Sequence, residues 1–226
     1  MVIAIDGPSG VGKTTITRRV AAILGIDYLD TGSTYRAATV AVLRSGVALT
    51  DRAAMLQAVR KCVIDYVDGT VLLDGEPIVE ESRSEAVTRA VSPVSGDPAV
   101  RAHIVALQRA WVAKRNGNAV VEGRDIGTVV FPEATVKVFL TAVPEVRARR
   151  RAGDAETDAM SIEAIAADLE RRDHADSTRE VSPLRKAGDA VEIDTSAMGV
   201  EEVVAAVIDL VTGAQTPSKS SAPAAE

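Results

Sequence analysis

Apolar runs alternate along this chain with stretches in which apolar residues recur every three or four positions. The run 2–5 is wholly apolar and is followed by a glycine-rich turn at 6–10, a pattern typical of a buried strand in a parallel sheet. Helical spacing begins at Lys13, and Gly25 is placed to end this helix. Further strands are predicted by apolar runs at 28–30, 119–121, 136–140 and 191–193, with helical spacing between them. The alternation predicts an α/β fold with a parallel central sheet.

Two stretches interrupt this alternation. After Gly46 the pattern predicts a helix that Thr50 caps and that carries Val63, followed by short strands at 63–67 and 70–73 joined by an Asp-Gly hairpin turn. Residues 147–188 mix charges of both signs and hold few apolar residues, which predicts a helix–turn–helix flap that stands off the core.

These interruptions suggest how the chain is organised. We expect a single domain over residues 1–212, with an insert at about 46–96 and a lid at about 147–188. The tail 213–226 is made mainly of Ala, Ser, Pro and Thr and cannot bury much apolar surface, so we expect it to be disordered.

Composition limits the class of protein. The 226 residues carry a net charge of −6, which argues against a basic nucleic-acid binder. The single cysteine, Cys62, excludes an internal disulfide and a cysteine zinc site and fits a reducing compartment. We see no secretion leader in the first residues, and no apolar run approaches the ~18 residues of a membrane span. We expect a cytoplasmic monomer without nucleic-acid or membrane partners.

The turn after the first strand carries a phosphate-binding motif. Residues 7–14, GPSGVGKT, match the pattern G-x-x-x-x-G-K-[ST]. Its glycines let backbone N–H groups approach phosphate oxygens, and the next helix adds the positive end of its dipole. We expect Lys13 to reach the β- and γ-phosphates of ATP and the Thr14 hydroxyl to bind Mg²⁺. The predicted ATP-binding residues are Gly7, Pro8, Ser9, Gly10, Val11, Gly12, Lys13, Thr14, Thr15 and, from an arginine-rich stretch at the edge of the flap, Arg150.

Two polar segments fall at predicted strand ends, where ligands bind in such folds. The segment 30–36 offers hydroxyls, an aromatic ring and a guanidinium, although Thr31 or Ser33 could equally serve as a helix cap. The segment 122–128 holds a Gly-flanked Arg-Asp pair, which suggests a close approach to a ligand or, alternatively, a surface ion pair.

A third polar segment lies on the flap. Arg172, Asp176 and Arg179 are spaced to share one face of a helix. Two guanidiniums beside a carboxylate suit a phosphate-and-ribose site, but a solvated, salt-bridged helix face has the same spacing.

Together these segments resemble bacterial cytidylate kinases. The resemblance is carried by the phosphate loop, by DTGSTYR at 30–36, by EGRDIGTVVFP at 122–132 and by the flap sequence at 172–184, in the family's order over about residues 2–210. It implies a P-loop three-layer α/β fold with a small three-stranded insert for the nucleoside monophosphate and a helical lid. It also implies a kinase that transfers the γ-phosphoryl group of ATP to CMP or dCMP with Mg²⁺.

The resemblance further implies roles for single residues. Ser92, Arg101 and Asp125 match the positions that recognise cytosine, and Asp176 matches the position that bonds the sugar. Thr31 stands where many members have Ser. The residues matched to catalysis are Lys13, Arg124, Arg172 and Arg179. The residues matched to CMP binding are Thr31, Tyr35, Arg36, Ser92, Arg101, Arg124, Asp125, Arg172, Asp176 and Arg179.

Two other functions compete with this one. A kinase for another small acceptor, such as adenylate or shikimate, would share the phosphate loop. A nucleotide-binding regulator or RNA-associated switch would also use it, but three Tyr, two Phe and one Trp give few platforms for stacking bases.

Overall fold

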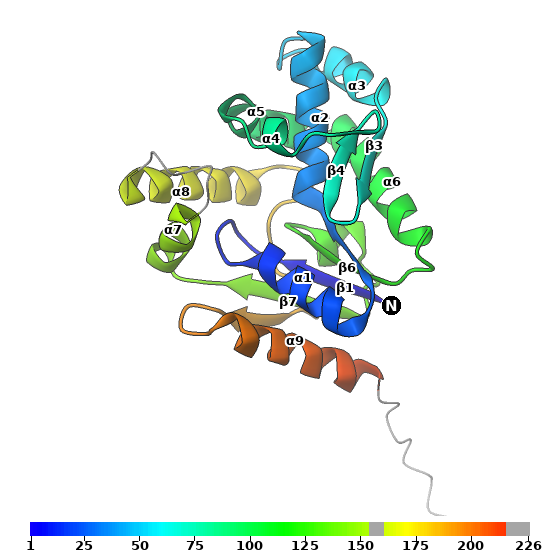
Figure 1. The fold of residues 1–226 in the computed structure, drawn as a ribbon. Coiled ribbons are helices and arrows are strands. Elements are labelled where there is room, and N and C mark those ends of the chain that lie inside the picture. The colour runs from blue at the N-terminus through cyan, green and yellow to red at the C-terminus, as the bar shows by residue number, and fades with distance from the viewer. Residues whose placement is uncertain (154–160, 216–226) are drawn as a thin grey trace, which may run out of the picture.

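Five parallel strands form the central sheet of the protein (Figure 1). In chain order they are β1 (Val2–Asp6), β2 (Asp27–Asp30), β6 (Ala119–Gly123), β7 (Val136–Thr141) and β8 (Val191–Asp194). Across the sheet the order is β2-β6-β1-β7-β8. The computed structural model describes residues 1–153 and 161–215. The predicted α/β class with a parallel central sheet is confirmed.

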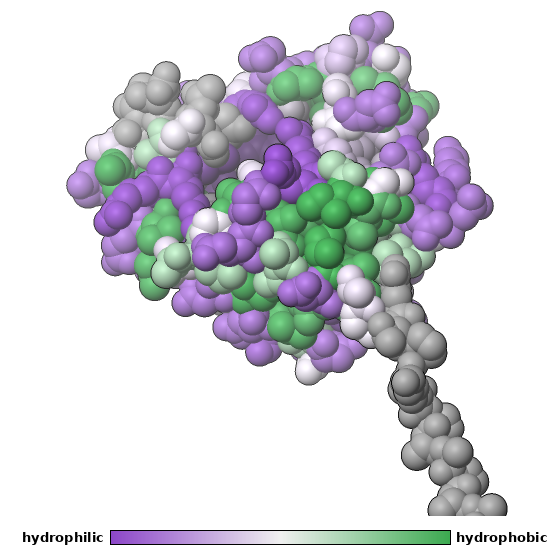
Figure 2. Space-filling model, turned by 60° about the horizontal axis from the view of Figure 1, so that its bottom comes forward, coloured by the Kyte–Doolittle hydropathy of each residue, from purple (hydrophilic) through white to green (hydrophobic). Residues whose placement is uncertain are grey.

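Helices cover both faces of this sheet, as its continuous apolar strands require. Ile3 and Ile5 of β1 pack with the helices of one face, whereas Ala4, between them, packs with those of the other. The first face is covered by α1 (Lys13–Leu24) and α9 (Val200–Gln215), and the second by α2 (Thr31–Ser45) and α6 (Pro98–Ala113). Apolar side chains also gather on the surface of the side that carries α9 (Figure 2).

A small antiparallel sheet lies within the span predicted as an insert. Its strands are β3 (Ile64–Val67), β4 (Thr70–Leu73) and β5 (Glu76–Pro77), and the helices around it are α3 (Arg52–Arg60), α4 (Val79–Ser82) and α5 (Glu85–Gly96). The predicted hairpin turn is present, with positive φ at both Asp68 and Gly69. The Trp111 indole of α6 donates to the Tyr66 carbonyl at 2.6 Å and so ties this sheet to the core.

The helix before this sheet differs from its prediction. Asp51, not Thr50, caps α3, and its carboxylate accepts from the Ala54 amide at 2.9 Å. A carboxylate at this position satisfies one of the free N–H groups of the first turn. The helix ends at Arg60, so Val63 lies outside it and is 67% exposed.

The charged flap forms two helices beside the sheet, at the left of Figure 1. They are α7 (Pro144–Ala152) and α8 (Ile162–Thr178), and they share a small apolar cluster of Ala148, Ile165 and Leu169. The predicted tail starts too early, because α9 continues to Gln215, and residues 216–226 lie outside the described part. The division into core, insert and lid stays a prediction. In the described ranges we find no helix long and apolar enough to cross a membrane.

Truncating a side chain inside the sheet should measure what the core contributes. Leu140 of β7 is fully buried, and a core Leu→Ala change costs about 2–5 kcal/mol. We expect Leu140→Ala to lower the free energy of unfolding in urea by that amount. Ile23→Ala, at a position that is 58% exposed on α1, should change it by less than about 0.5 kcal/mol. Equal losses in both variants would contradict the packing described for β7.

Candidate active site

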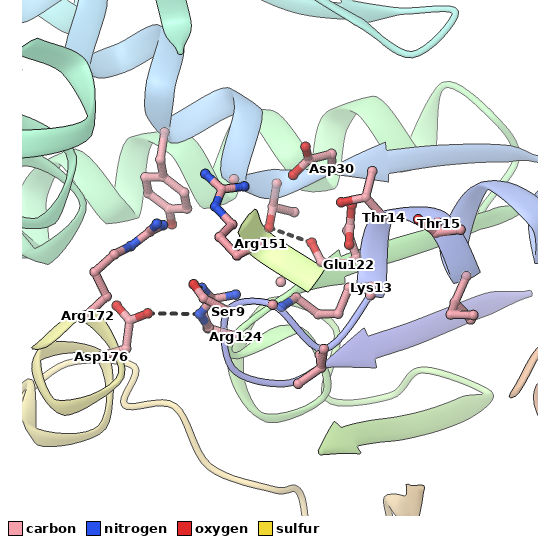
Figure 3. A pocket seen from close by; sticks show the side chains of 18 of the residues that line it. Ser9, Lys13, Thr14, Thr15, Asp30, Glu122, Arg124, Arg151, Arg172 and Asp176 are labelled. Atoms are coloured by element: carbon pink, nitrogen blue, oxygen red, sulfur yellow. Dashed lines mark hydrogen bonds and ion pairs between the residues drawn. The ribbon is translucent and has the colours of Figure 1, made fainter. Parts of the chain in front are cut away.

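The predicted phosphate loop lies between the end of β1 and the start of α1 (Figure 3). Lys13 Nζ donates to the carbonyls of Gly7 at 2.8 Å and Pro8 at 2.7 Å. Gly7 has φ 150°, and a Cβ there would lie 2.3 Å from the Leu140 carbonyl oxygen. Gly10 and Gly12 also have positive φ, so this loop needs glycines both for its backbone conformation and for its contact with β7.

One cavity of about 500 Å³ opens above this loop. It is lined by every residue predicted to bind ATP or CMP except Gly7 and Pro8. The structure therefore brings together side chains from the phosphate loop, the ends of β2 and β6, α2, α5, α6 and the flap. The predicted site residues that line it are Ser9, Gly10, Val11, Gly12, Lys13, Thr14, Thr15, Thr31, Tyr35, Arg36, Ser92, Arg101, Arg124, Asp125, Arg150, Arg172, Asp176 and Arg179.

The segment after β2 contributes the first turn of α2. Asp30 caps this helix by accepting from the Ser33 amide at 3.2 Å, so neither Thr31 nor Ser33 is the cap. The buried Thr31 hydroxyl donates to the Glu122 carbonyl at 2.6 Å, which joins β2 to β6 beside the cavity. Arg36 extends toward the insert and donates to the Ser82 carbonyl at 2.8 Å.

Arg124 and Asp125 do not pair with each other. Asp125 forms a buried ion pair with Arg101 of α6 at 2.5 Å, with both side chains at most 5% exposed. The Arg101 guanidinium also lies 5.0 Å from the ring centroid of Tyr35. A surface ion pair, the alternative for this segment, is therefore wrong, because both charges have other partners and Asp125 is buried.

Arg124 joins the phosphate loop to the flap. Its guanidinium donates to the Asp176 carboxylate at 2.8 Å, to the Ser9 hydroxyl at 2.6 Å and to the Gly7 carbonyl at 3.1 Å (Figure 3). The Arg124 side chain thus contacts both the phosphate loop, where ATP is predicted to bind, and Asp176, the predicted sugar-binding carboxylate.

The flap also contacts the loop through Asp173, a residue that the sequence analysis did not select. Its carboxylate accepts from the Ser9 amide at 3.2 Å and pairs with Arg147 of α7. An acidic residue next to Arg172 was the only signal in the sequence, and that signal does not distinguish a loop contact from a solvated charge.

Arg179 lies just past the end of α8, not on it. Its backbone is extended, with φ −63° and ψ 142°. Even so, its guanidinium lies 3.4 Å from Asp176 and 3.9 Å from Asp125, and it also donates to the Ser182 carbonyl. The predicted helix face is wrong for this residue, but Arg179 lines the same cavity as Arg172 and Asp176.

Arg172 has several other arginine side chains near it. Burial, and then the neighbouring guanidiniums of Arg124, Arg36 and Arg151, lower its pKa to about 10, against Asp168. Arg150 lines the same cavity and donates to the Thr195 hydroxyl at 2.8 Å and carbonyl at 2.7 Å. Such a concentration of cations in an acidic protein favours an anionic ligand.

Glu122, at the end of β6, is the main residue that the sequence analysis missed. It is 2% exposed, and neither carboxylate oxygen accepts a well-formed hydrogen bond from the described residues. Burial and then Asp30 raise its pKa to about 8, against Lys13, the Thr14 hydroxyl and Arg124. The pKa of Lys13 is lowered to about 7 by burial and then by Arg124. The signal in the sequence was an acidic residue that ends an apolar run, directly before Gly123.

These residues fit a hydrated Mg²⁺ ion. Two unpartnered carboxylate oxygens lie beside the Thr14 hydroxyl (Figure 3), and oxygen is the ligand that Mg²⁺ prefers. Among the described residues no group of three His, Cys, Asp or Glu side chains could hold a metal alone. An ion here would therefore share its coordination with water and phosphate oxygens.

The loop, the parallel sheet and the cation-lined cavity define a phosphate-loop kinase. Solved structures share this fold: a gluconokinase from Sinorhizobium meliloti 1021 matches with a TM-score of 0.52 and 16% identity over 94% of this chain and 91% of its own. TT1252 from Thermus thermophilus matches with a TM-score of 0.52 and 17% identity over 96% and 98%. At these identities the likeness shows the fold alone.

The family follows from closer relatives. A family model described as Cytidylate kinase matches residues 3–213. The cytidylate kinase of Mycobacterium leprae (strain Br4923) is 51% identical over 93% of this chain and 95% of its own, and that of Mycolicibacterium paratuberculosis (strain ATCC BAA-968 / K-10) is 52% identical over 93% and 95%. The chain belongs to the cytidylate kinase family. This confirms the resemblance seen in its motifs and makes the chain an ATP-dependent phosphotransferase.

Removing Arg172 should separate activity from stability. Because like charges surround this guanidinium, we expect Arg172→Ala to leave the melting temperature unchanged or slightly raised. Losing a cation that stabilises transferring phosphoryl groups should lower kcat about 100- to 1,000-fold. Arg171→Ala removes a neighbouring arginine that is 67% exposed and paired with Asp168, and it should change neither quantity. A parallel loss of stability and activity in Arg172→Ala would make this residue structural.

Proposed function

We propose that the γ-phosphoryl group of ATP, held by the phosphate loop, passes in this cavity to CMP or dCMP, held beside the Arg101–Asp125 pair. The observation that carries the proposal is that one cavity of about 500 Å³ joins these two features. Residues that line the same cavity carry buried polar atoms that have no hydrogen-bond partner among the described residues, namely Tyr35 Oη, Arg101 Nε, Arg179 Nη2 and both Glu122 carboxylate oxygens. Such atoms are costly unless a polar ligand satisfies them.

The acceptor base would be read by Asp125, Arg101 and Ser92. The Asp125 carboxylate can accept from the C4 amino group of cytosine, and the other two side chains can donate to its O2 and N3. Uracil presents a carbonyl at C4 and an N–H at N3, so the same groups would be left unpaired. Mismatched buried polar groups discriminate strongly between ligands. The burial of the Arg101–Asp125 pair supports this assignment.

The phosphates would be held by Lys13 and the arginines. The acceptor phosphate is already ionised at neutral pH, since its second pKa is about 6, so the reaction needs no general base. What it needs is positioning of two anions and neutralisation of their charge. Arg124, Arg172 and Arg179 line the cavity near Asp176, whose carboxylate could accept from a sugar hydroxyl.

Thr14 and Glu122 would hold Mg²⁺, either directly or through water molecules bound to the ion. When bound, the ion neutralises phosphate charge during transfer. We also propose that Thr15 and Arg150 contact ATP, because both residues line the cavity. The protein is further proposed to act as a cytoplasmic monomer.

An acceptor screen tests the proposed reaction. ADP release should be measured with Mg·ATP and each of CMP, dCMP, UMP, AMP and GMP. We expect strong turnover with CMP and dCMP, at least tenfold lower kcat/KM with UMP, and no stimulation by the purine nucleotides.

The screen also separates the competing functions. Turnover with another acceptor, shikimate included, would keep the phosphate loop and overturn the roles of Ser92, Arg101 and Asp125. Nucleotide binding with no acceptor-stimulated turnover would favour a regulator.

Glu122→Gln tests the proposed metal site. The change keeps the shape of the side chain but removes its ability to ionise when Mg²⁺ binds, so we expect the Mg²⁺ concentration for half-maximal turnover to rise about tenfold. Calorimetry should show that Mg²⁺ no longer strengthens ATP binding as it does in the parent protein, while ATP binding without Mg²⁺ is not weakened. Glu133→Gln, at an exposed position outside the cavity, is the control. Unaltered Mg²⁺ dependence in Glu122→Gln would exclude this carboxylate from the metal site.

A further inference from the structure

The chain directly after Asp125 forms a single wide helical turn, the π-helix η1 (Ile126–Val130). Two hydrogen bonds of this turn end on Asp125 itself, because its carbonyl accepts from the Val129 amide at 2.9 Å and from the Val130 amide at 3.1 Å. The orientation of Asp125 is therefore set by the turn that follows it, and not only by its ion pair with Arg101.

Asp6 holds the first end of this turn. Its carboxylate oxygens accept one hydrogen bond each, from the Ile126 amide at 2.8 Å and from the Gly127 amide at 2.7 Å. The side chain is 4% exposed. A Cβ at Gly127 would lie 3.5 Å from Asp6 Oδ2 and 3.1 Å from the Lys137 side chain. A side chain at 127 would therefore crowd Lys137, whereas its contact with the Asp6 carboxylate would be an ordinary one.

Arg109 of α6 holds the other end. Its guanidinium donates through Nε to the Val130 carbonyl at 2.9 Å and through Nη2 to the Val129 carbonyl at 2.8 Å. The turn is therefore held at its free N–H groups by an anion and at its free carbonyls by a cation, each from a different element. Two-point contacts of this kind fix direction as well as distance.

We propose that Asp6 and Arg109 are positioning residues for acceptor choice, which orient Asp125 through the turn between them. The inference rests on the proposed role of Asp125 in reading the acceptor base. Neither residue lines the cavity, so neither contacts the acceptor directly, although the charge of Asp6 also acts on Lys13 and Asp125. Asp6 also directly precedes the phosphate loop, so the same carboxylate connects the end of β1 to the acceptor side of the site.

The chemistry of Asp6 explains why a carboxylate is needed. Two amide N–H groups require two acceptors, whereas an asparagine would place a donor against one of them. Burial raises the pKa of Asp6 to about 6, and the two amide hydrogen bonds oppose that rise. The side chain is therefore mainly ionised at neutral pH and accepts at both oxygens.

The test compares the ratio of kcat/KM for CMP to that for UMP, because this ratio does not depend on how much of the enzyme is folded. We expect Asp6→Asn and Arg109→Met each to lower the ratio about tenfold or more, mainly through KM for CMP, with KM for ATP changed less than twofold. Asp125→Asn should lower it at least as much.

Matched controls separate positioning from stability. Ile3→Ala creates a cavity in the same strand as Asp6, at a fully buried position, and should lower the melting temperature without changing the ratio. Arg115→Met removes another arginine, just past the end of α6, which binds Asp27 and not the turn, and should also leave the ratio unchanged.

The outcomes separate the positioning role of Asp6 and Arg109 from the proposed role of Asp125. An unchanged ratio in Asp6→Asn and Arg109→Met, together with a lowered ratio in Asp125→Asn, would overturn the inference and leave the proposed function intact. An unchanged ratio in Asp125→Asn would overturn both. Arg109 lies on the surface, so its variant decides the matter even where Asp6→Asn does not fold.

Discussion

The parallel pairing of β1 with β6 is the constraint on which the site depends. Its register sets Asp6 opposite Gly123, so both strands end at the same edge of the sheet, where ligands of such folds bind. The phosphate loop leaves one strand and the Arg124–Asp125 segment leaves the other, and one cavity receives both. The fit is close, because a Cβ on Gly123 would lie 2.6 Å from Ile126 and 2.7 Å from the Thr31 hydroxyl. A shift of one residue in this pairing would move the two segments apart and turn their side chains to the opposite faces of the sheet.

The electrostatics of the cavity follow from this arrangement. The pKa values of Lys13 and Arg172 are lowered and that of Glu122 is raised, so each shift favours the neutral form of the side chain. Burial is the largest cause in each case. Charges held in this way are expensive for the folded protein, but they need no reorganisation when phosphate charge arrives. The apolar sheet core on either face of β1 supplies the stability that such a site lacks.

The sequence predicted the features that depend on local pattern. Apolar runs placed the strands of the sheet, and the spacing of GPSGVGKT placed the phosphate loop, because both signals lie within a few residues. Pairings across the fold could not be predicted in this way. Adjacent Arg124 and Asp125 resemble an ion pair in the sequence, yet tertiary structure gives one to Asp176 and the other to Arg101. Glu122 was marked in the sequence only as an acidic residue between an apolar run and Gly123, and its importance comes from its burial and from the charge of Asp30 and the hydroxyl of Thr14 near it.

The flap is connected to the phosphate loop by polar contacts of the kind that also bind phosphate. Among its described residues the flap has only a small apolar cluster, Ala148, Ile165 and Leu169, and it makes polar contacts with the phosphate loop and with Arg124. Arg147 donates to the Ser9 carbonyl, Asp173 accepts from the Ser9 amide, and Asp176 accepts from Arg124, which itself binds the loop. A carboxylate and a phosphate both offer anionic oxygens to the same kinds of donor. The N–H donors that bind the flap carboxylates are therefore of the same kind as those that would bind nucleotide phosphates. A bound phosphate would compete with the flap carboxylates for these donors.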